Sequence, residues 1–293
     1  METTVVEDRS AIDRATFAFV EDLAAALNGR EPIDIPSFPN IAMRVKKVLE
    51  DQNSSSEKIG RVVGSEPGLA SRLLKMANSA ALNTSGRQVL DIKTAINRLG
   101  HDQIRSSAMS FAMKNLMDSR TVTELKPFLT ELWNHSIQVA AIAYALGQRT
   151  AGVKPDEAMF VGLVHDIGKL YILTRIESYP DLCSCSDTMD HIMNDWHTSI
   201  GKSILENWDF PEHVQHAIEQ HEDQNRQIYA DPDLTDVIIV ANLFANHSDS
   251  NNCLLDFASV ASCQRMGIDV PEFQEIMVES QKEINELENA LRG

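Results

Sequence analysis

Gly162-Leu163-Val164-His165-Asp166-Ile167-Gly168-Lys169-Leu170 is the stretch of this chain that decides its fold and points to its chemistry. An imidazole and a carboxylate stand side by side in it, with apolar residues on both sides. A buried charge is costly unless it is paired or bound to a metal. Three more histidines, His135, His197 and His221, follow at intervals of 30, 32 and 24 residues around His165. This spacing predicts one ligand on each of several helices, converging in the middle of a bundle.

Helical periodicity extends in both directions from this stretch, and no segment has a convincing strand pattern. We therefore predict an all-α fold with short connections between helices. The expected helices cover residues 10–28, 40–50, 54–63, 66–77, 92–99, 104–117, 124–146, 155–166, 191–207, 211–221, 234–244, 253–266 and 271–291.

Capping residues mark several of the expected helix ends, and Ser54-Ser55-Ser56-Glu57 is a cluster typical of a helix start. Pro67 falls in a first turn, Asp91 is placed to cap the helix that follows it, and Gly100 is placed to end that helix. Adjacent helical residues point about 100° apart, so His165 and Asp166 reach one ion only where the backbone turns. We expect Gly168 to end the helix and permit that turn.

Composition restricts the class of function. The chain has 293 residues, 43% of them hydrophobic, and a formal net charge of −17. Such an acidic chain is repelled by a phosphate backbone, so nucleic-acid binding is not expected. The N-terminus lacks the pattern of a secretory leader, and no run of about 18 apolar residues predicts a membrane span. We expect a cytoplasmic protein.

The cysteines and the remaining histidines have ordinary explanations. The four cysteines are too few for a disulfide framework, and Cys183-x-Cys185 is read as ordinary thiols rather than half of a soft-metal site. A lone helical histidine is more often a hydrogen-bonded or solvated residue than a ligand. That interpretation applies to His101, His191, His213, His216 and His247.

At this point the chain resembles a known family. Gly162–Lys169 is similar to the signature of the HD superfamily of metal-dependent phosphohydrolases, and the remainder resembles one branch, the HDOD domain (HD-related output domain) of bacterial signalling proteins. The motifs that carry the resemblance are Pro36–Pro39, Glu66–Ala80, Ile92–Gly100, Trp133–Ser136, His197–Gly201, Trp208–Pro211 and Ala217–His221.

The resemblance implies a domain organisation. Residues 31–245 would form the HDOD domain, with an N-terminal helical lobe at 31–125 and an HD-like lobe at 126–245. Residues 1–30 would form an N-terminal helix and residues 246–293 would form C-terminal helices. The expected architecture is a two-lobed helical bundle with an HD-like C-terminal half.

The resemblance also implies a metal site holding one or two divalent cations (Fe, Mn, Zn or Mg). Asp166 and Lys169 would carry any catalysis, with Lys169 facing a substrate phosphate. The expected metal ligands are His135, His165, Asp166, His197, His221 and Asn242. Asn242 replaces the family's last Asp ligand, Glu222 replaces the second member of a His-His pair, and the Gly-Tyr-Pro motif of cyclic-dinucleotide phosphodiesterases is missing.

Two functions stay open on this basis. The favoured hypothesis is a bacterial signal-transduction output or interaction module, with a protein partner in a signalling pathway and a vestigial or ion-binding site. The alternative is a metal-dependent phosphohydrolase acting on a nucleotide or cyclic dinucleotide. The Glu66–Ala80 segment has two interpretations as well. Its apolar residues form core and Asn78 caps a helix end, or the segment lines a partner-binding groove between the two lobes.

Overall fold

The computed structural model describes residues 2–29, 33, 35, 39–79, 86–119, 125–183, 185–227, 230–247 and 257–292. Over these residues the chain forms helices and no strand, so the predicted all-α class is confirmed. None of the described helices is both long enough and apolar enough to cross a bilayer.

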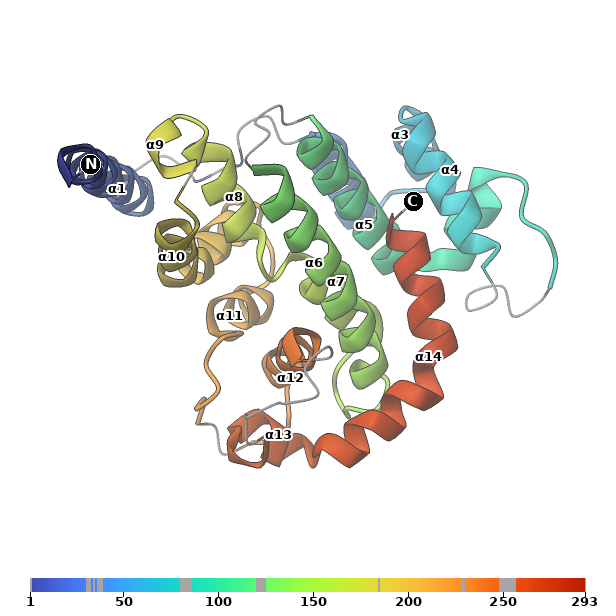
Figure 1. Ribbon diagram of the computed structural model, residues 1–293. Helices are drawn as coiled ribbons and strands as arrows, with labels where there is room; N and C mark the ends of the chain where they lie inside the picture. Colours follow the sequence, from blue (N-terminus) through green and yellow to red (C-terminus); the bar gives the residue numbers. More distant parts are fainter. Residues whose placement is uncertain are drawn as a thin grey trace.

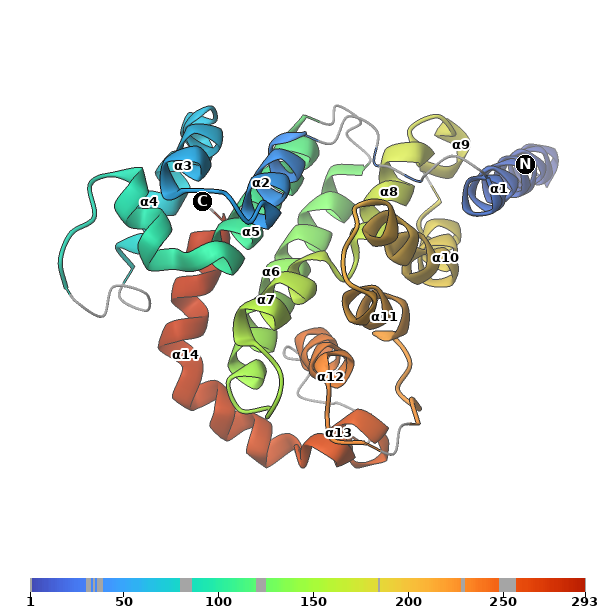
Figure 2. The same cartoon turned by 180° about the vertical axis from the view of Figure 1, so that it is seen from behind.

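The helices fall into three groups along the chain, as Figures 1 and 2 show from opposite sides. The N-terminal group comprises α1 (Glu2–Asn28), α2 (Ile41–Glu50), α3 (Ser56–Gly64), α4 (Pro67–Ala77) and α5 (Ile92–Asp118). The middle group comprises α6 (Lys126–Gly147), α7 (Pro155–Val164), α8 (Ile167–Ile176), α9 (Pro180–Cys183), α10 (Ser186–Asn207), α11 (Glu212–Gln220) and α12 (Leu234–His247). The last group is the short 3₁₀ helix η2 (Phe257–Ser259), α13 (Ala261–Met266) and α14 (Val270–Arg292).

The capping predictions hold in the N-terminal group. The Ser55 side chain accepts a hydrogen bond from the amide of Lys58 at the start of α3, and Pro67 begins α4. The Asp91 side chain accepts from the amide of Thr94. Gly100 has φ 75° and ψ 174°, a non-helical conformation that kinks α5 and divides it into two helical segments where a stop was expected. A positive φ of this size favours glycine.

Other boundaries differ from the expected ones. Helix α1 starts at Glu2 rather than near residue 10, and α10 starts at Ser186 rather than at residue 191. The apolar pattern that indicates a helix is weak in these first turns, so periodicity alone misses them. Of the helix expected over 253–266, residues 253–256 lie outside the described part of the chain.

The middle of the molecule is packed around α6 and α7. A side chain at Gly162 in α7 would place a Cβ 2.9 Å from the Cα of Ala140 in α6, so glycine is needed for the two backbones to lie this close. Both helices are almost entirely buried over this contact. A close-packed helix pair is rigid, and it holds the residues at its ends in fixed positions.

The prediction that Gly168 ends a helix is wrong. Helix α7 ends at Val164 and α8 begins at Ile167, so the turn is made by His165 and Asp166 themselves. Gly168 lies inside α8, where an added Cβ would be 1.9 Å from the carbonyl oxygen of His197 in α10. The glycine is there for the close approach of α8 to α10, not for chain reversal.

Helix α14 packs against helices of both the N-terminal group and the middle group. It runs beside α6 and its last turn reaches α4 and α5 (Figure 1). The buried Ser110 hydroxyl of α5 donates to the carbonyl of Leu291 at 2.8 Å, and the Arg72 guanidinium of α4 donates to the carbonyl of Arg292 at 3.3 Å. The last carbonyls of a helix lack partners within it. Here α4 and α5 of the N-terminal group supply those partners.

Candidate metal centre

Six helices bring the expected ligands together, with Asn242 on α12. His135 lies on α6 and His197 on α10, while His221 follows the last residue of α11. His165 and Asp166 form the turn between α7 and α8. A helix break places both side chains of this adjacent pair on the same side of the chain, which a continuous helix does not allow.

His135, His165 and Asp166 form a first group of potential ligands. The Nε2 atoms of His135 and His165 are 3.2 Å apart. The Oδ2 atom of Asp166 is 3.3 Å from Nε2 of His165 and 3.9 Å from Nε2 of His135. One ligand atom from each residue lies within 4.8 Å of the other two, a spacing that suits a common cation.

Asp166, His197, His221 and Glu222 form a second group. The Oδ1 atom of Asp166 is 3.4 Å from Nε2 of both His197 and His221, and these two nitrogens are 3.2 Å apart. The Oε1 atom of Glu222 is 3.5 Å from Nε2 of His221. Asp166 therefore belongs to both groups, with one carboxylate oxygen facing each, which is the arrangement of a ligand shared by two cations.

Hydrogen bonds orient three of the imidazoles. The Nδ1 atoms of His165, His197 and His221 lie 2.8, 2.7 and 2.7 Å from the backbone carbonyls of Gly162, Met193 and Ile218. A carbonyl only accepts, so each Nδ1 carries the proton and donates it. In a neutral ring Nε2 is then left with its lone pair directed into the centre, the tautomer that binds metals.

The pKa values follow from burial and from mutual contact. Burial lowers the pKa of both His135 and His197 to about 4, so these rings are neutral at pH 7. Burial opposes ionisation of Asp166, yet the charges of His165 and Lys169 hold its pKa well below the ordinary value. Burial also opposes charge on His221, but hydrogen bonds to Asp166 and Glu222 raise its pKa to about 9.

These features test whether the residues fit a cation. Two Nε2 lone pairs 3.2 Å apart repel each other unless a proton or a cation lies between them, and the raised pKa of His221 means that a proton fills this role in the cation-free protein. The Oδ1 atom of Asp166 is buried and faces the Nε2 atoms of His197 and His221, each 3.4 Å away. Such an atom is costly unless something charged pairs with it. The donor set of imidazole nitrogens and carboxylate oxygens fits Fe, Mn or Zn better than Mg.

Asn242 and Glu222 are linked in the structure. The Asn242 Oδ1 atom is 2.9 Å from Nε2 of His135, and its Nδ2 donates to Oε1 of Glu222 at 3.3 Å. Contact with His221 lowers the pKa of Glu222 to about 2. Asn242 lacks the carboxylate of the Asp expected from the resemblance, and Glu222 provides a carboxylate beside the second group instead. The sequence shows Glu222 only as a departure from the family motif. Its contact with the second group of potential ligands is visible only in the structure.

Lys169 lies at the edge of the centre. Its Nζ donates to Oδ2 of Asp166 at 2.8 Å, and a cavity of about 290 Å³ opens beside it. His135, Asp166 and Lys169 are among the residues that line this cavity. His135 is 17% exposed and His165 is fully buried, so the first group is reached from this side.

The residues expected to lie outside the site do so where they are described. His101, His191, His213 and His216 are exposed on the surface, as predicted. The side chains of His247 and Cys183 and all of Cys253 lie outside the described part. Cys185 and Cys263 are free thiols.

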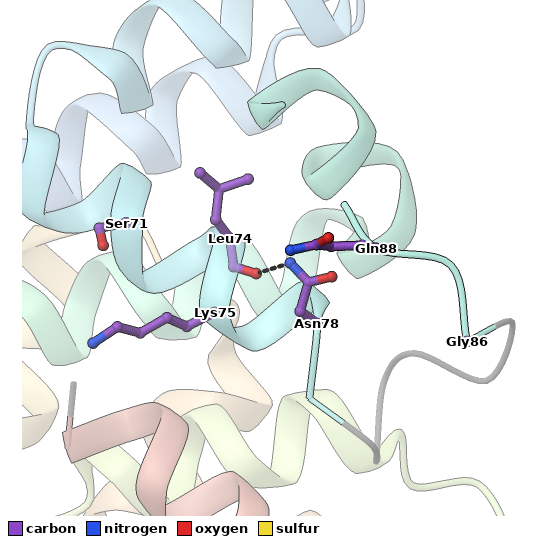
Figure 3. Close-up of a pocket in the computed structure, with 6 residues that line it drawn as sticks. All are labelled: Ser71, Leu74, Lys75, Asn78, Gly86 and Gln88. Carbon is purple, nitrogen blue, oxygen red and sulfur yellow. Dashed lines mark hydrogen bonds between the residues drawn. The ribbon is translucent and has the colours of Figure 1, made fainter. Parts of the chain in front are cut away.

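A separate hollow of about 530 Å³ lies over the end of α4, lined by Ser71, Lys75 and Asn78 among others (Figure 3). Asn78 Nδ2 donates to the carbonyls of Leu74 and Val89, and its Oδ1 accepts from the amide of Val89. The Asn78 amide is therefore used in capping α4 and holding the segment that follows. This confirms the expected capping role.

The HDOD domain model matches residues 35–224 of this chain. The chain belongs to the HDOD family. A relative from Treponema pallidum (strain Nichols), described as an uncharacterized protein, is 26% identical over 215 residues, covering 68% of this chain and 39% of that protein. This chain thus spans about two fifths of that relative's length.

Solved structures share the HDOD fold. A candidate metal-dependent phosphohydrolase from Shewanella amazonensis SB2B superposes with a TM-score of 0.75 at 24% identity, covering 96% of this chain and 99% of that one. An HDOD protein of unknown function from Geobacter sulfurreducens gives 0.64 at 20% identity, covering 96% and 98%. A candidate signal-transduction protein from Marinobacter aquaeolei VT8 gives 0.58 at 18% identity, covering 98% and 66%. At these identities the likeness establishes the fold.

Proposed function

We propose that this HDOD protein is a bacterial signal-transduction output module whose HD-like lobe binds one or two divalent cations. The observation that carries the proposal is the position of Asp166. Its two oxygens face separate histidine pairs, His135 with His165 and His197 with His221. A buried carboxylate between two sets of imidazole lone pairs is a site for cations rather than a packing arrangement.

The signalling role is supported by family membership and by how the lobes are joined. The Arg292 guanidinium at the end of α14 donates to Oδ1 of Asn134 at 2.6 Å, and Asn134 precedes His135 in α6. The same helix end is held by Ser110 and Arg72 of the N-terminal lobe. A change at the cation site therefore has a short route to the contact between lobes, where a protein partner would sense it.

A second candidate function is metal-dependent phosphohydrolysis, which Lys169 and the adjoining cavity favour. A bound cation would supply a Lewis acid and a water of lowered pKa. His135, His165 and Asp166 would hold the first cation, with Asn242 beside His135. The Lys169 ammonium would stabilise negative charge developing on a phosphoryl oxygen, because such charge is best stabilised by donors already in place.

One experiment separates the two functions. Mn²⁺ binding to purified wild type and to His165→Ala is measured by calorimetry, and turnover is assayed with bis-p-nitrophenyl phosphate, nucleoside monophosphates and cyclic dinucleotides. The signalling proposal predicts Mn²⁺ binding that His165→Ala weakens at least tenfold, without turnover. Turnover by wild type that His165→Ala abolishes would establish the hydrolase. Wild type that takes up no cation would overturn both.

A further inference from the structure

Arg292, in the last turn of α14, links α4 to the helix that carries a potential cation ligand. Its guanidinium donates to Oδ1 of Asn134 in α6 at 2.6 Å, and Asn134 directly precedes His135. Its backbone carbonyl accepts from the Arg72 guanidinium of α4 at 3.3 Å. The end of α14 therefore contacts both the N-terminal group of helices and the turn of α6 that presents His135 (Figure 1).

Arg72 is a buried cation that has no carboxylate partner among the described residues. It is 6% exposed, and burial lowers the pKa of its guanidinium. Its neighbours are the Ser110 hydroxyl, 2.8 Å from Nη1, and the Phe111 ring, whose centroid is 5.7 Å from Cζ. A buried charge is costly unless it is paired. The carbonyls at the end of a helix carry partial negative charge, so the end of α14 supplies the compensation that no described carboxylate provides.

Apolar packing holds the body of α14 against α6, and polar contacts hold its last turn. One face of the helix is buried along its length, at Phe273, Ile276, Ser280, Ile284, Leu287 and Leu291. The ends of helices open at the smallest cost in free energy. When the last turn undocks, Arg72 loses the carbonyl of Arg292, so a partly undocked position is costly. The last turn is therefore a two-state element, either docked or released.

His135 is the imidazole of the centre whose position depends most on its own helix. The other three imidazoles are each fixed by a hydrogen bond from Nδ1 to a backbone carbonyl. Within the described part of the chain, Nδ1 of His135 has no such acceptor, and this side chain is 17% exposed. The 3.2 Å separation of its Nε2 from that of His165 is thus set by where α6 places it. A shift of α6 at Asn134 changes the first group of ligands, whereas the second group lies on other helices.

We propose that Arg292 is a positioning residue for His135, and that the last turn of α14 is a latch that sets the affinity of the first cation site. Docked, the latch holds α6 where His135 completes that site; released, it weakens the site. This inference rests on the proposed cation-binding function and specifies how α4 and α5 act on it. Because coupling between two sites is reciprocal, a cation at the first site must in turn hold the latch docked.

The test combines Mn²⁺ calorimetry with amide hydrogen exchange on chelator-treated full-length protein. The latch variant is Arg292→Ala, which removes an exposed side chain, and Arg292→Lys is the conservative variant that keeps a donor. The matched control is Arg149→Ala. Arg149 also joins α6 to α14, by donating to Oε2 of Glu279 at 2.8 Å, but it lies fourteen residues from His135.

Two backgrounds separate the cation sites. His197→Ala removes a ligand of the second group and leaves the first group intact, while His135→Ala does the reverse. Each background carries the latch variant, the conservative variant or the control in turn. A role of Arg292 in general stability would move both sites alike, whereas a positioning role moves the first site alone.

The proposal predicts that Arg292→Ala weakens Mn²⁺ binding about fivefold in the His197→Ala background, a typical coupling between sites, and leaves it unchanged in the His135→Ala background. Arg292→Lys should restore affinity to within twofold of the parent, and Arg149→Ala should stay within twofold in both backgrounds. In otherwise wild-type protein, Mn²⁺ should slow amide exchange in the last turn of α14 by about the same factor of five, and Arg292→Ala should abolish this slowing.

Three results would overturn the latch while leaving cation binding intact. One is unchanged affinity of Arg292→Ala at the first site, and another is an equal loss at both sites. The third is amide exchange in the last turn of α14 that Mn²⁺ does not alter in wild type. Wild type that takes up no Mn²⁺ would overturn the proposed function and the latch together, so uptake by wild type reports on function and the difference between sites reports on the latch.

Discussion

Replacing Gly168 with Ala should separate the two halves of the cation centre. The added Cβ would lie 1.9 Å from the carbonyl oxygen of His197, 2.7 Å from its carbonyl carbon and 2.9 Å from its Cα. Real Cβ contacts essentially never fall below 3.0 Å, so α8 and α10 must move apart by at least 1.1 Å (3.0 minus 1.9). All three atoms are backbone and cannot rotate away. Overpacking of this kind costs about 1–3 kcal/mol, and a backbone collision belongs at the upper end, about 3 kcal/mol.

The same movement carries His197 away from Asp166. The Nε2 atom of His197 is 3.4 Å from the Oδ1 atom of Asp166. Urea denaturation and Mn²⁺ calorimetry of Gly168→Ala should therefore show a lower free energy of unfolding and loss of the second cation, with the first retained. The matched control is Gly64→Ala at the end of α3, where a Cβ has nothing within 4 Å. Alanine there should stabilise the protein by about 0.5–1 kcal/mol. If Gly168→Ala is as stable as Gly64→Ala and binds the same number of cations, this account of Gly168 is refuted.

Three further predictions concern other contacts. In cation-free protein the pKa of His221 is raised from 6.5 to about 9, so a bound cation must displace the proton of His221. Mn²⁺ affinity should therefore rise from pH 6.5 to 9, and calorimetry in buffers of different ionisation enthalpy should show about one proton released per cation. An affinity that does not change with pH would contradict this. The same raised pKa stabilises the cation-free fold, fully below pH 6.5, and that stability is lost as pH rises through about 9. Asp236→Asn should lower the free energy of unfolding in urea by about 3 kcal/mol without changing the number of cations bound. The reason is that the fully buried Asp236 carboxylate accepts hydrogen bonds from Arg265, Arg226 and Ser262. A loss of stability below about 1 kcal/mol would contradict this role of Asp236. Ser110→Ala should lower stability by about 1–3 kcal/mol and speed amide exchange in the last turn of α14, because Leu291 loses its donor; unchanged exchange there would show that this hydrogen bond does not hold the helix.

The helices and most of their ends were predictable from local chemistry. Ser55, Pro67 and Asp91 each act on groups within three residues, so their effect is visible in the sequence. Gly168 shows where local reasoning fails. A glycine after a helical pattern ordinarily indicates a stop, yet this one is required by the backbone of His197, twenty-nine residues later.

The sequence predicts which residues belong to the candidate cation centre, but it does not predict how they are arranged. The ordered motifs identify His135, His165, Asp166, His197 and His221 as residues of interest. Their division into two groups that share Asp166 depends on side-chain positions from five helices. The hydrogen bond of Asn242 with Glu222 joins residues twenty positions apart in the sequence. Residue type alone indicates none of these contacts.

The most direct test of the central claim is a crystal structure of the protein soaked with Mn²⁺, with anomalous difference maps at the manganese edge. We predict one peak between His135, His165 and Oδ2 of Asp166, and a second between His197, His221 and Oδ1 of Asp166. In Asp166→Ala crystals both peaks should disappear, because the carboxylate is shared. Wild-type maps with no peak among these side chains, or unchanged peaks without Asp166, would contradict the account.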